Sequence, residues 1–262
     1  FFASCDRPDS YGGCDLYYST LINDTLWSSA YNMGQKINTK YWESQPSISS
    51  DGKLLFFASN RYGGYGGSDI WVSRKHNETW LDPVNLGPNI NTPYDESSPF
   101  LHYDNQTFYF ASRGHDGFGG FDLFVAELDT SGVFSNVQNL GYPINTHHDE
   151  SGLIVTKNGL NAYFNSNMSG NLDIYSFMLP TKFSPNPVVI VQGQLIDSIS
   201  RLGVGGDIFV NDVNKDWEYG INVDESGFFS FSVPMQSVFS INFYTKSYDF
   251  LSEKITLKKD SS

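Results

Sequence analysis

The sequence has few positive charges and no long apolar run. Its 262 residues include 16 lysines and arginines against 29 aspartates and glutamates, which gives a formal net charge of −13. Such a charge repels nucleic-acid phosphates and anionic lipid surfaces, and no basic run offsets it locally. No stretch approaches the roughly 18 apolar residues of a membrane-spanning helix. We therefore expect no nucleic-acid partner and no direct membrane insertion of this segment.

Cysteine is almost absent, and the start of the sequence carries no export signal. The chain begins at Phe1 without an initiator methionine, a basic region or an apolar region. We therefore expect any signal peptide to have been removed or to lie outside this segment. The only two cysteines, Cys5 and Cys14, flank a glycine-containing loop. That placement suits a local disulfide in an oxidising compartment, and two free thiols are the alternative.

Aromatic residues and an internal repeat are what the sequence has in abundance. Phenylalanine and tyrosine number 21 and 16, a bias that favours strands over helices. The tripeptide Phe-Ala-Ser that ends at Ser4 recurs at Ser59 and Ser112, and as Phe-Asn-Ser at Ser166. The successive spacings are 55, 53 and 54 residues. A period of this length indicates a repeat architecture with four copies in this chain.

Each copy carries the same polar residues. A glycine-rich turn precedes an Asp-apolar-aromatic step, whose aspartates are Asp15, Asp69, Asp122 and Asp173. Three copies are entered through a Glu-Ser pair, whose glutamates are Glu43, Glu96 and Glu150. The apolar runs are short and separated by Gly, Asn, Asp and Pro, which predicts four strands per copy, in the second copy near residues 45–49, 54–59, 69–73 and 83–86. Four short antiparallel strands at this period describe a blade of a β-propeller.

The repeat does not close on itself. The first copy starts inside its second strand, and the fourth ends after its third strand near Met178. A propeller needs roughly four to eight blades. We therefore expect the missing first strand, further blades and the strand that completes the last blade to come from sequence upstream of Phe1.

A second module follows the repeat. Residues 179–187 include three prolines and predict a short semi-rigid linker. Beyond it, alternating strands are predicted at 189–195, 207–210, 228–233, 239–244 and near 254–257. The predicted fold class is all-β: an incomplete propeller of four-stranded blades over residues 1–178, the linker, and a small antiparallel β-sandwich over residues 188–259.

The repeat resembles a known family. Residues 49–61, Ser-Ser-Asp-Gly-Lys-Leu-Leu-Phe-Phe-Ala-Ser-Asn-Arg, are similar to the WD-like propeller repeat of the TolB type. The longer Gly-Gly-x-Gly-Gly-x-Asp form, followed by Asn-Leu-Gly and Ile-Asn-Thr, resembles the version found in OmpA-family periplasmic lipoproteins of Bacteroidetes. This resemblance covers residues 1–178 and implies a propeller in a periplasmic protein.

The second module resembles the carboxypeptidase regulatory-like domain. The similarity lies in residues 191–197, 203–205, 224–229 and 246–250, although Val-Gly-Gly replaces the usual Pro-Gly-Ala. The order of modules is similar to that of envelope proteins with tetratricopeptide repeats before and a peptidoglycan-binding OmpA-like domain after, one of them associated with type IX secretion. This implies a periplasmic location with outer-membrane association through parts outside this chain. Neither flanking domain is in this sequence, so peptidoglycan binding is carried over to no residue here.

The repeated acids and arginines have two interpretations. The aspartates are ligands or hydrogen-bonding struts between turns, and a fixed place in every copy favours struts. The glutamates form an acidic cation site at the channel mouth or are structural, and structure is again favoured. Arg7, Arg61 and Arg113 are expected to pair with backbone carbonyls or acidic neighbours within the blade.

The search for a metal, a cofactor or a catalytic site gives no candidate. His147 and His148 stand beside Asp149 and Glu150, but adjacent side chains on an extended segment point in opposite directions, so we expect no metal. The glycine-rich turns lack the following helix and the Gly-Lys-Ser/Thr of a phosphate-binding loop, and no Gly-x-Ser-x-Gly elbow is present. We expect neither a cofactor nor catalytic residues.

The exposed aromatics of the glycine-rich turns are the best candidates for binding. Tyr62, Tyr65 and Phe118 lie on rigid loops and suit the anchoring of a partner, although the same rings could pack on the adjacent blade. We expect a non-enzymatic periplasmic module that docks envelope proteins, in a complex related to type IX secretion or gliding. The alternative is a module that binds a glycan or a peptidoglycan fragment by stacking these rings on sugars.

Overall fold

The computed structural model describes residues 1–262 except 24, 77–78, 213–217, 236, 246–250 and 258–262. Residues 246–250, which carry part of the resemblance in the second module, therefore lie outside the described residues. The contacts divide the chain into two units, Phe1–Pro185 and Asn186–Ser262. Each unit is described by itself.

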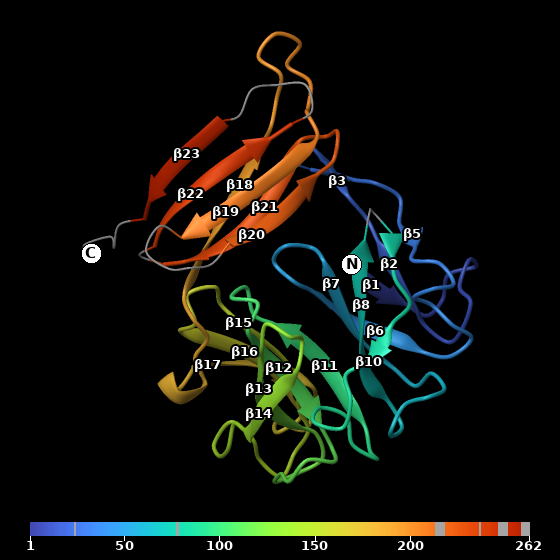
Figure 1. The fold of residues 1–262 in the computed structure, drawn as a ribbon. Helices are drawn as coiled ribbons and strands as arrows, with labels where there is room; N and C mark the ends of the chain where they lie inside the picture. The colour runs from blue at the N-terminus through green and yellow to red at the C-terminus, as the bar shows by residue number, and fades with distance from the viewer. Residues whose placement is uncertain (24, 77–78, 213–217, 236, 246–250, 258–262) are drawn as a thin grey trace. The chain divides into compact units, whose positions relative to one another are not determined.

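The first unit consists of four successive antiparallel sheets (Figure 1). The first blade pairs β1 (Phe2–Ser4), β2 (Asp15–Tyr18) and β5 (Tyr31–Asn32), and its β2–β5 connection carries the hairpin β3 (Leu21–Asn23) and β4 (Leu26–Trp27). The second pairs β6 (Glu43–Ile48), β7 (Leu54–Ser59), β8 (Asp69–His76) and β10 (Val84–Asn85), with β9 (Thr79–Trp80) beside β8. The third pairs β11 (Glu96–Leu101), β12 (Thr107–Ser112), β13 (Asp122–Leu128) and β14 (Phe134–Asn139). The fourth pairs β15 (Glu150–Val155), β16 (Asn161–Ser166) and β17 (Asp173–Met178).

The blades share one register. Each strand-end serine of the repeat lies opposite the repeated aspartate of the next strand: Ser4 opposite Asp15, Ser59 opposite Asp69, Ser112 opposite Asp122, and Ser166 opposite Asp173. The first strand of three blades contains a bulge with a positive φ at equivalent residues, which are Gln45 (54°), Ser98 (52°) and Gly152 (66°). The repeat of 53 to 55 residues in the sequence therefore corresponds to one blade of the structure.

Hydrophobic cores lie between consecutive blades. Between the second and third blades, Ile70 of β8 packs with Ile90 of the next connection and with Phe108 and Phe110 of β12. The cores on either side are built in the same way, around Leu16 and Ile37 and around Leu123 and Ile144. Each of the first three blades thus buries the apolar residue that follows its aspartate against the next blade.

The first unit extends past residue 178, the boundary expected from the sequence. Leu179 and Phe183, the latter in the short 3-10 helix η1 (Thr181–Phe183), are buried in the core of the third and fourth blades. The hydroxyl of Tyr109 donates to the carbonyl oxygen of Phe183 at 2.6 Å. These contacts attach the first part of the expected linker to the blades.

The second unit is a β-sandwich of two sheets. One sheet pairs β18 (Val188–Gln194) with β21 (Phe228–Pro234). The other has the order β20 (Glu218–Val223), β19 (Gly206–Asp212), β22 (Val238–Tyr244) and β23 (Leu251–Thr256). Phe231 and Val233 of the first sheet and Ile208, Phe239 and Ile241 of the second form its core. Strand β20 was not expected from the sequence. Its apolar residues Ile221 and Val223 are separated by a polar residue and preceded by glycine, so they form no clear apolar run.

The chain is therefore all-β, with propeller blades followed by a small antiparallel sandwich. In the described parts of the chain, no helix is long and apolar enough to cross a membrane.

Candidate functional site

In the first three blades, the repeated aspartates fix the glycine-rich loops that join the second and third strands. Oδ2 of Asp69 accepts the backbone N–H of Tyr65 at 2.6 Å, and Oδ1 accepts that of Gly66 at 3.0 Å. Asp15 and Asp122 accept the same pair of N–H groups in the first and third blades, from Tyr11 and Gly12 and from Phe118 and Gly119. A side chain that accepts two successive N–H groups fixes a turn in one conformation.

The same loops press their glycines against the connection that enters the next blade. A Cβ atom on Gly66 would lie 1.9 Å from the carbonyl oxygen of Tyr94. Gly12 and Gly119 meet the carbonyl oxygens of Tyr41 and His148 at 2.2 and 2.3 Å in the same way. Because only glycine fits so close to a backbone, the loop is held by its neighbour as well as by its own aspartate.

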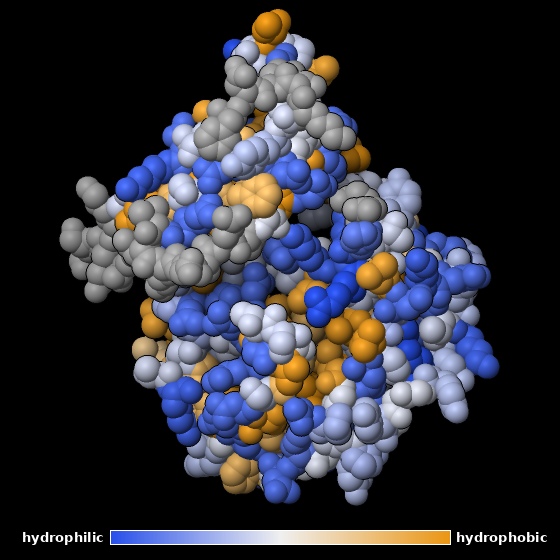
Figure 2. Space-filling model, viewed as in Figure 1, coloured by the Kyte–Doolittle hydropathy of each residue, from blue (hydrophilic) through white to orange (hydrophobic). Residues whose placement is uncertain are grey.

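In the first three blades, this construction presents an aromatic ring at one equivalent loop position. Tyr11, Tyr65 and Phe118 each precede the close-packed glycine, and 45%, 53% and 56% of their surfaces are exposed. Tyr62 at the loop apex is 91% exposed, and Tyr94 in the connection is 63% exposed. We call these five residues the loop aromatics. Apolar side chains also gather on the face of residues 1–185 that Figure 2 shows.

Two of the loop aromatics were not expected from the sequence. Tyr65 and Phe118 were candidates, but Tyr11 occupies the equivalent position in the first blade and was overlooked. The signal was present, because Tyr-Gly-Gly-x-Asp occurs at Tyr11 and Tyr65 and Phe-Gly-Gly-x-Asp at Phe118. Tyr94 was also overlooked. Tyr41 is its counterpart in the first connection, but His148 takes this position in the third, so the signal was weaker.

The fourth copy departs from this pattern. Asp173 is exposed and accepts a hydrogen bond from the hydroxyl of Ser169, at the position where the other copies have an aromatic residue. Its loop therefore presents no ring of the same kind.

The repeated glutamates are buried within the blades. Glu43, Glu96 and Glu150 each have 0% exposed surface. Each accepts the hydroxyl of a threonine and of a strand-end serine; for Glu96 these are Thr92 at 2.7 Å and Ser112 at 2.6 Å. Burial raises the pKa of Glu96, and the hydrogen bonds from Ser112 and Thr92 oppose that shift. These carboxylates face protein donors, not solvent.

The arginines do not occupy equivalent places. Arg61 lies 3.2 Å from Glu43 and donates to the carbonyl oxygen of Ile37 at 2.5 Å. In the third blade, the corresponding carbonyl oxygen, of Ile90, lies 3.0 Å from Nε2 of His115. Arg113 instead pairs with Asp149 at 3.3 Å and lies over the ring of Phe121. Arg7 lies 3.5 Å from Asp9 and over the ring of Tyr17.

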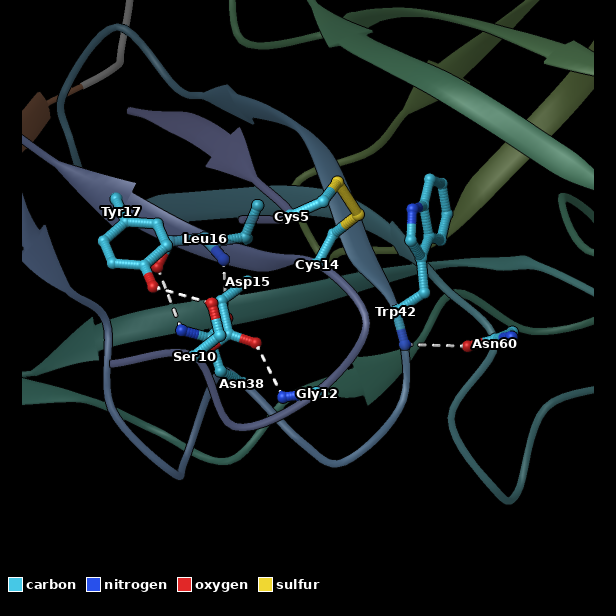
Figure 3. The surroundings of a disulfide bond; sticks show 10 residues. All are labelled: Cys5, Ser10, Gly12, Cys14, Asp15, Leu16, Tyr17, Asn38, Trp42 and Asn60. Carbon is cyan, nitrogen blue, oxygen red and sulfur yellow. Dashed lines mark hydrogen bonds between the residues drawn. A yellow bond between two sulfur atoms is a disulfide. The ribbon is translucent and has the colours of Figure 1, made fainter. Parts of the chain in front are cut away.

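The cysteines close the first glycine-rich loop. Cys5 and Cys14 form a disulfide at its base (Figure 3). Next to it, Asp15 accepts the N–H of Gly12, and the N–H of Leu16 donates to the side chain of Asn38. The disulfide thus adds a covalent link to the loop that carries Tyr11.

The expected orientation of the two histidines is wrong. The rings of His147 and His148 lie side by side, with centroids 4.0 Å apart, because the backbone bends at these residues instead of forming an extended strand. Among the side chains that the structure describes, no group of three or more His, Cys, Asp or Glu is arranged to hold a metal ion.

Comparison with known proteins gives distant structural similarity only. No protein-family model matches the sequence, and no curated protein matches it. TolB from Acinetobacter baumannii is similar in structure, with 13% identity and a TM-score of 0.45 over 95% of this chain and 58% of that one. A puromycin-hydrolyzing peptidase of Mycobacterium tuberculosis has 10% identity and a TM-score of 0.41 over 92% of this chain and 38% of that one. A putative TolB from Agrobacterium tumefaciens has 13% identity and a TM-score of 0.33 over 79% and 94%.

This chain thus spans 58% and 38% of the lengths of the first two of these structures. At such identities and TM-scores, the similarities assign no activity, ligand or partner to it.

Proposed function

We propose that this chain is a non-enzymatic docking module that binds a protein partner through the loop aromatics. The observation that carries the proposal is the threefold recurrence of an aromatic ring at one loop position, half-exposed and fixed by an aspartate. A ring on a rigid backbone loses little conformational entropy on binding, and such rings anchor protein interfaces. Tyrosine in particular combines a large apolar face with a hydroxyl that hydrogen-bonds at a wet interface.

The absence of catalysis is part of the same proposal. A glycoside-cleaving propeller would need a pair of solvent-facing carboxylates. The acids that the repeat places at the start of the first strands, Glu43, Glu96 and Glu150, are buried and bonded to hydroxyl groups. They are therefore better suited to holding the blades than to proton transfer.

The location of the module is proposed from the sequence. A disulfide and the resemblance to OmpA-family lipoproteins favour the periplasm, with outer-membrane association through other parts of the protein. The partner we propose is an envelope protein, in a complex related to type IX secretion or gliding.

A photo-crosslinking experiment tests the docking proposal. A benzoyl-phenylalanine in place of Tyr62 should crosslink one envelope protein, whose purified form then gives a dissociation constant. Tyr65→Ala with Phe118→Ala should weaken that binding at least about thirtyfold, the loss expected of interface anchors. Phe228→Ala, which removes a 68% exposed aromatic of the second unit, is the matched control and should leave it unchanged.

The same variants distinguish protein docking from the alternative function, which is binding of a glycan or a peptidoglycan fragment. A glycan or peptidoglycan-fragment binder would bind sugars on an array and lose that binding with Tyr65→Ala and Phe118→Ala, while no protein crosslinks at position 62. Equal protein binding by the double variant and the wild type would reject the docking proposal.

A further inference from the structure

The outward face of the fourth blade is apolar and open. Ile174 on β17, Tyr163 on β16 and Ile154 on β15 are 76%, 42% and 53% exposed. We call these three residues the fourth-blade face. The residues equivalent to Ile174 in the other blades, each directly after the repeated aspartate, are Leu16, Ile70 and Leu123, and all have 0% exposed surface. Tyr109, the equivalent of Tyr163, is also fully buried.

The other blades show what covers this position. Ile70 packs against Ile90, which belongs to an Ile-Asn-Thr segment, and against the second strand of the next blade. Ile37 and Ile144 of the other two Ile-Asn-Thr segments lie in the same cores as Leu16 and Leu123. Three independent cores therefore use one kind of segment to cover one kind of position.

An asparagine of the same segment also binds the main chain. The side chain of Asn91 accepts the N–H of Ile70 at 2.8 Å and donates to the carbonyl oxygen of Ile70 at 2.9 Å. Asn38 and Asn145 make the same two bonds with Leu16 and Leu123. Within the described part of the chain, no asparagine side chain does this for Ile174.

The strand edge at Ile174 matches its counterparts in register. Ile174 lies opposite Asn165 as Ile70 lies opposite Ala58, so the N–H and carbonyl of Ile174 point away from β16, toward the side that Asn91 occupies at Ile70. β17 is the outermost strand of its sheet, whereas β8 and β13 are followed by β10 and β14. An open edge beside an apolar face is a template for an added strand.

We propose that the fourth-blade face and the edge of β17 bind a β-segment of the Asn-x-Gly…Ile-Asn-Thr type. Its first residues pair with β17, its isoleucine covers Ile174, and its asparagine bonds the N–H and carbonyl of Ile174. A second copy of this chain is a poorer occupant, because Asn38, Asn91 and Asn145 are all engaged within their own blades. The site is separate from the loop aromatics and goes beyond the proposed docking function.

A peptide taken from the third blade tests the site. The probe is residues 134–149 of this sequence, which carry β14 and Ile-Asn-Thr, titrated into the full chain by calorimetry and by amide hydrogen exchange. We expect saturable binding and slower exchange of the Ile174 amide. Asn145→Asp in the peptide replaces the donor with a charged acceptor facing a carbonyl, and should weaken binding at least tenfold.

Variants of the protein locate the binding. Ile174→Asp should also weaken it at least tenfold, and the variant folds normally because the side chain is exposed. Ile199→Asp, which alters a 92% exposed isoleucine of the second unit, should bind like the wild type. No saturable binding at millimolar peptide, or equal binding by Ile174→Asp, would overturn the proposal. So would a dimer in analytical ultracentrifugation that Ile174→Asp dissociates, because a second copy would then cover the face.

Discussion

Arg61 and Glu43 form a buried ion pair at the start of the second blade. Nη2 of Arg61 lies 3.2 Å from Oε1 of Glu43, and the two side chains are only 9% and 0% exposed. Burial lowers the pKa of Arg61, and the charge and hydrogen bond of Glu43 oppose that shift. The arginine also donates to Ile37 and Ser59, so it joins the first blade to the second.

Removing this arginine should destabilise the blades strongly. Arg61→Met leaves a buried carboxylate without its cation, which costs about 3 kcal/mol or more. Arg113→Met is the matched control, because its pair with Asp149 is 45% and 38% exposed and is worth at most about 1 kcal/mol. Urea unfolding followed by tryptophan fluorescence measures both, since four of the five tryptophans lie in residues 1–185. Equal losses in the two variants would contradict the prediction.

Gly66, which packs against the connection to the third blade, should not tolerate a larger residue. Gly66→Ala places a methyl group 1.9 Å from the carbonyl oxygen of Tyr94 and 2.5 Å from that of Thr92, and neither backbone can yield without moving the connection. We expect a loss of more than about 2 kcal/mol in unfolding free energy. The loop must shift, so binding through Tyr65 should fall with it.

Gly13→Ala is the control for that experiment. Its nearest backbone atom would lie 3.6 Å away, an ordinary contact, so the loss should stay below about 1 kcal/mol. A stable Gly66→Ala protein with unchanged partner binding would show that the loop is not clamped as we describe.

Much of this architecture could be predicted from the sequence, because a repeat fixes the same register in every copy. The aspartates could be assigned a structural role in bonding the turns, because Asp before an apolar-aromatic step recurs after a glycine-rich turn in every copy. The role of His115 was not predicted, because Arg113 was taken as the equivalent of Arg61. The two arginines stand at different distances from their serines, one residue after Ser112 and two after Ser59, and this difference was overlooked. The contact between the rings of His147 and His148 was missed because the backbone bends there, whereas an extended segment had been assumed.

The asparagine of the Ile-Asn-Thr segment should be a major stabilising residue. Asn91→Ala leaves the N–H of Ile70 buried without a partner, which costs about 1 to 3 kcal/mol. The carbonyl oxygen of Ile70 loses the bond from Asn91 but keeps the one from the backbone N–H of Leu86, at 3.2 Å. We expect the free energy of unfolding, measured in urea, to fall by about 2 kcal/mol. Asn171→Ala changes an exposed asparagine of the fourth blade and should cost about 0.5 kcal/mol or less. If Asn91→Ala were equally mild, the bonds to Ile70 would contribute little.

Asp104 should make the first unit lose stability in acid. Burial alone would raise the pKa of this carboxyl, but hydrogen bonds from His102, Thr107 and Gln106 and the charge of His102 lower it to about 2. An unfolded aspartate has a pKa of about 3.9, so below that value the unfolded chain binds the proton more readily than the folded one. The stabilisation from Asp104 is therefore complete above about pH 4 and is lost as the pH falls toward 2.

The test is the slope of unfolding free energy against pH. Asp104→Asn removes the titrating group, so the curve of the variant should be flatter than that of the wild type between about pH 4 and pH 2. Asp129→Asn is the control: the hydroxyl of Ser131 lowers the pKa of Asp129 as well, but this carboxylate is exposed, so solvent screens it and the slope should change less. Parallel curves for the wild type and Asp104→Asn would show that the contacts of Asp104 do not favour its charged form in the folded protein.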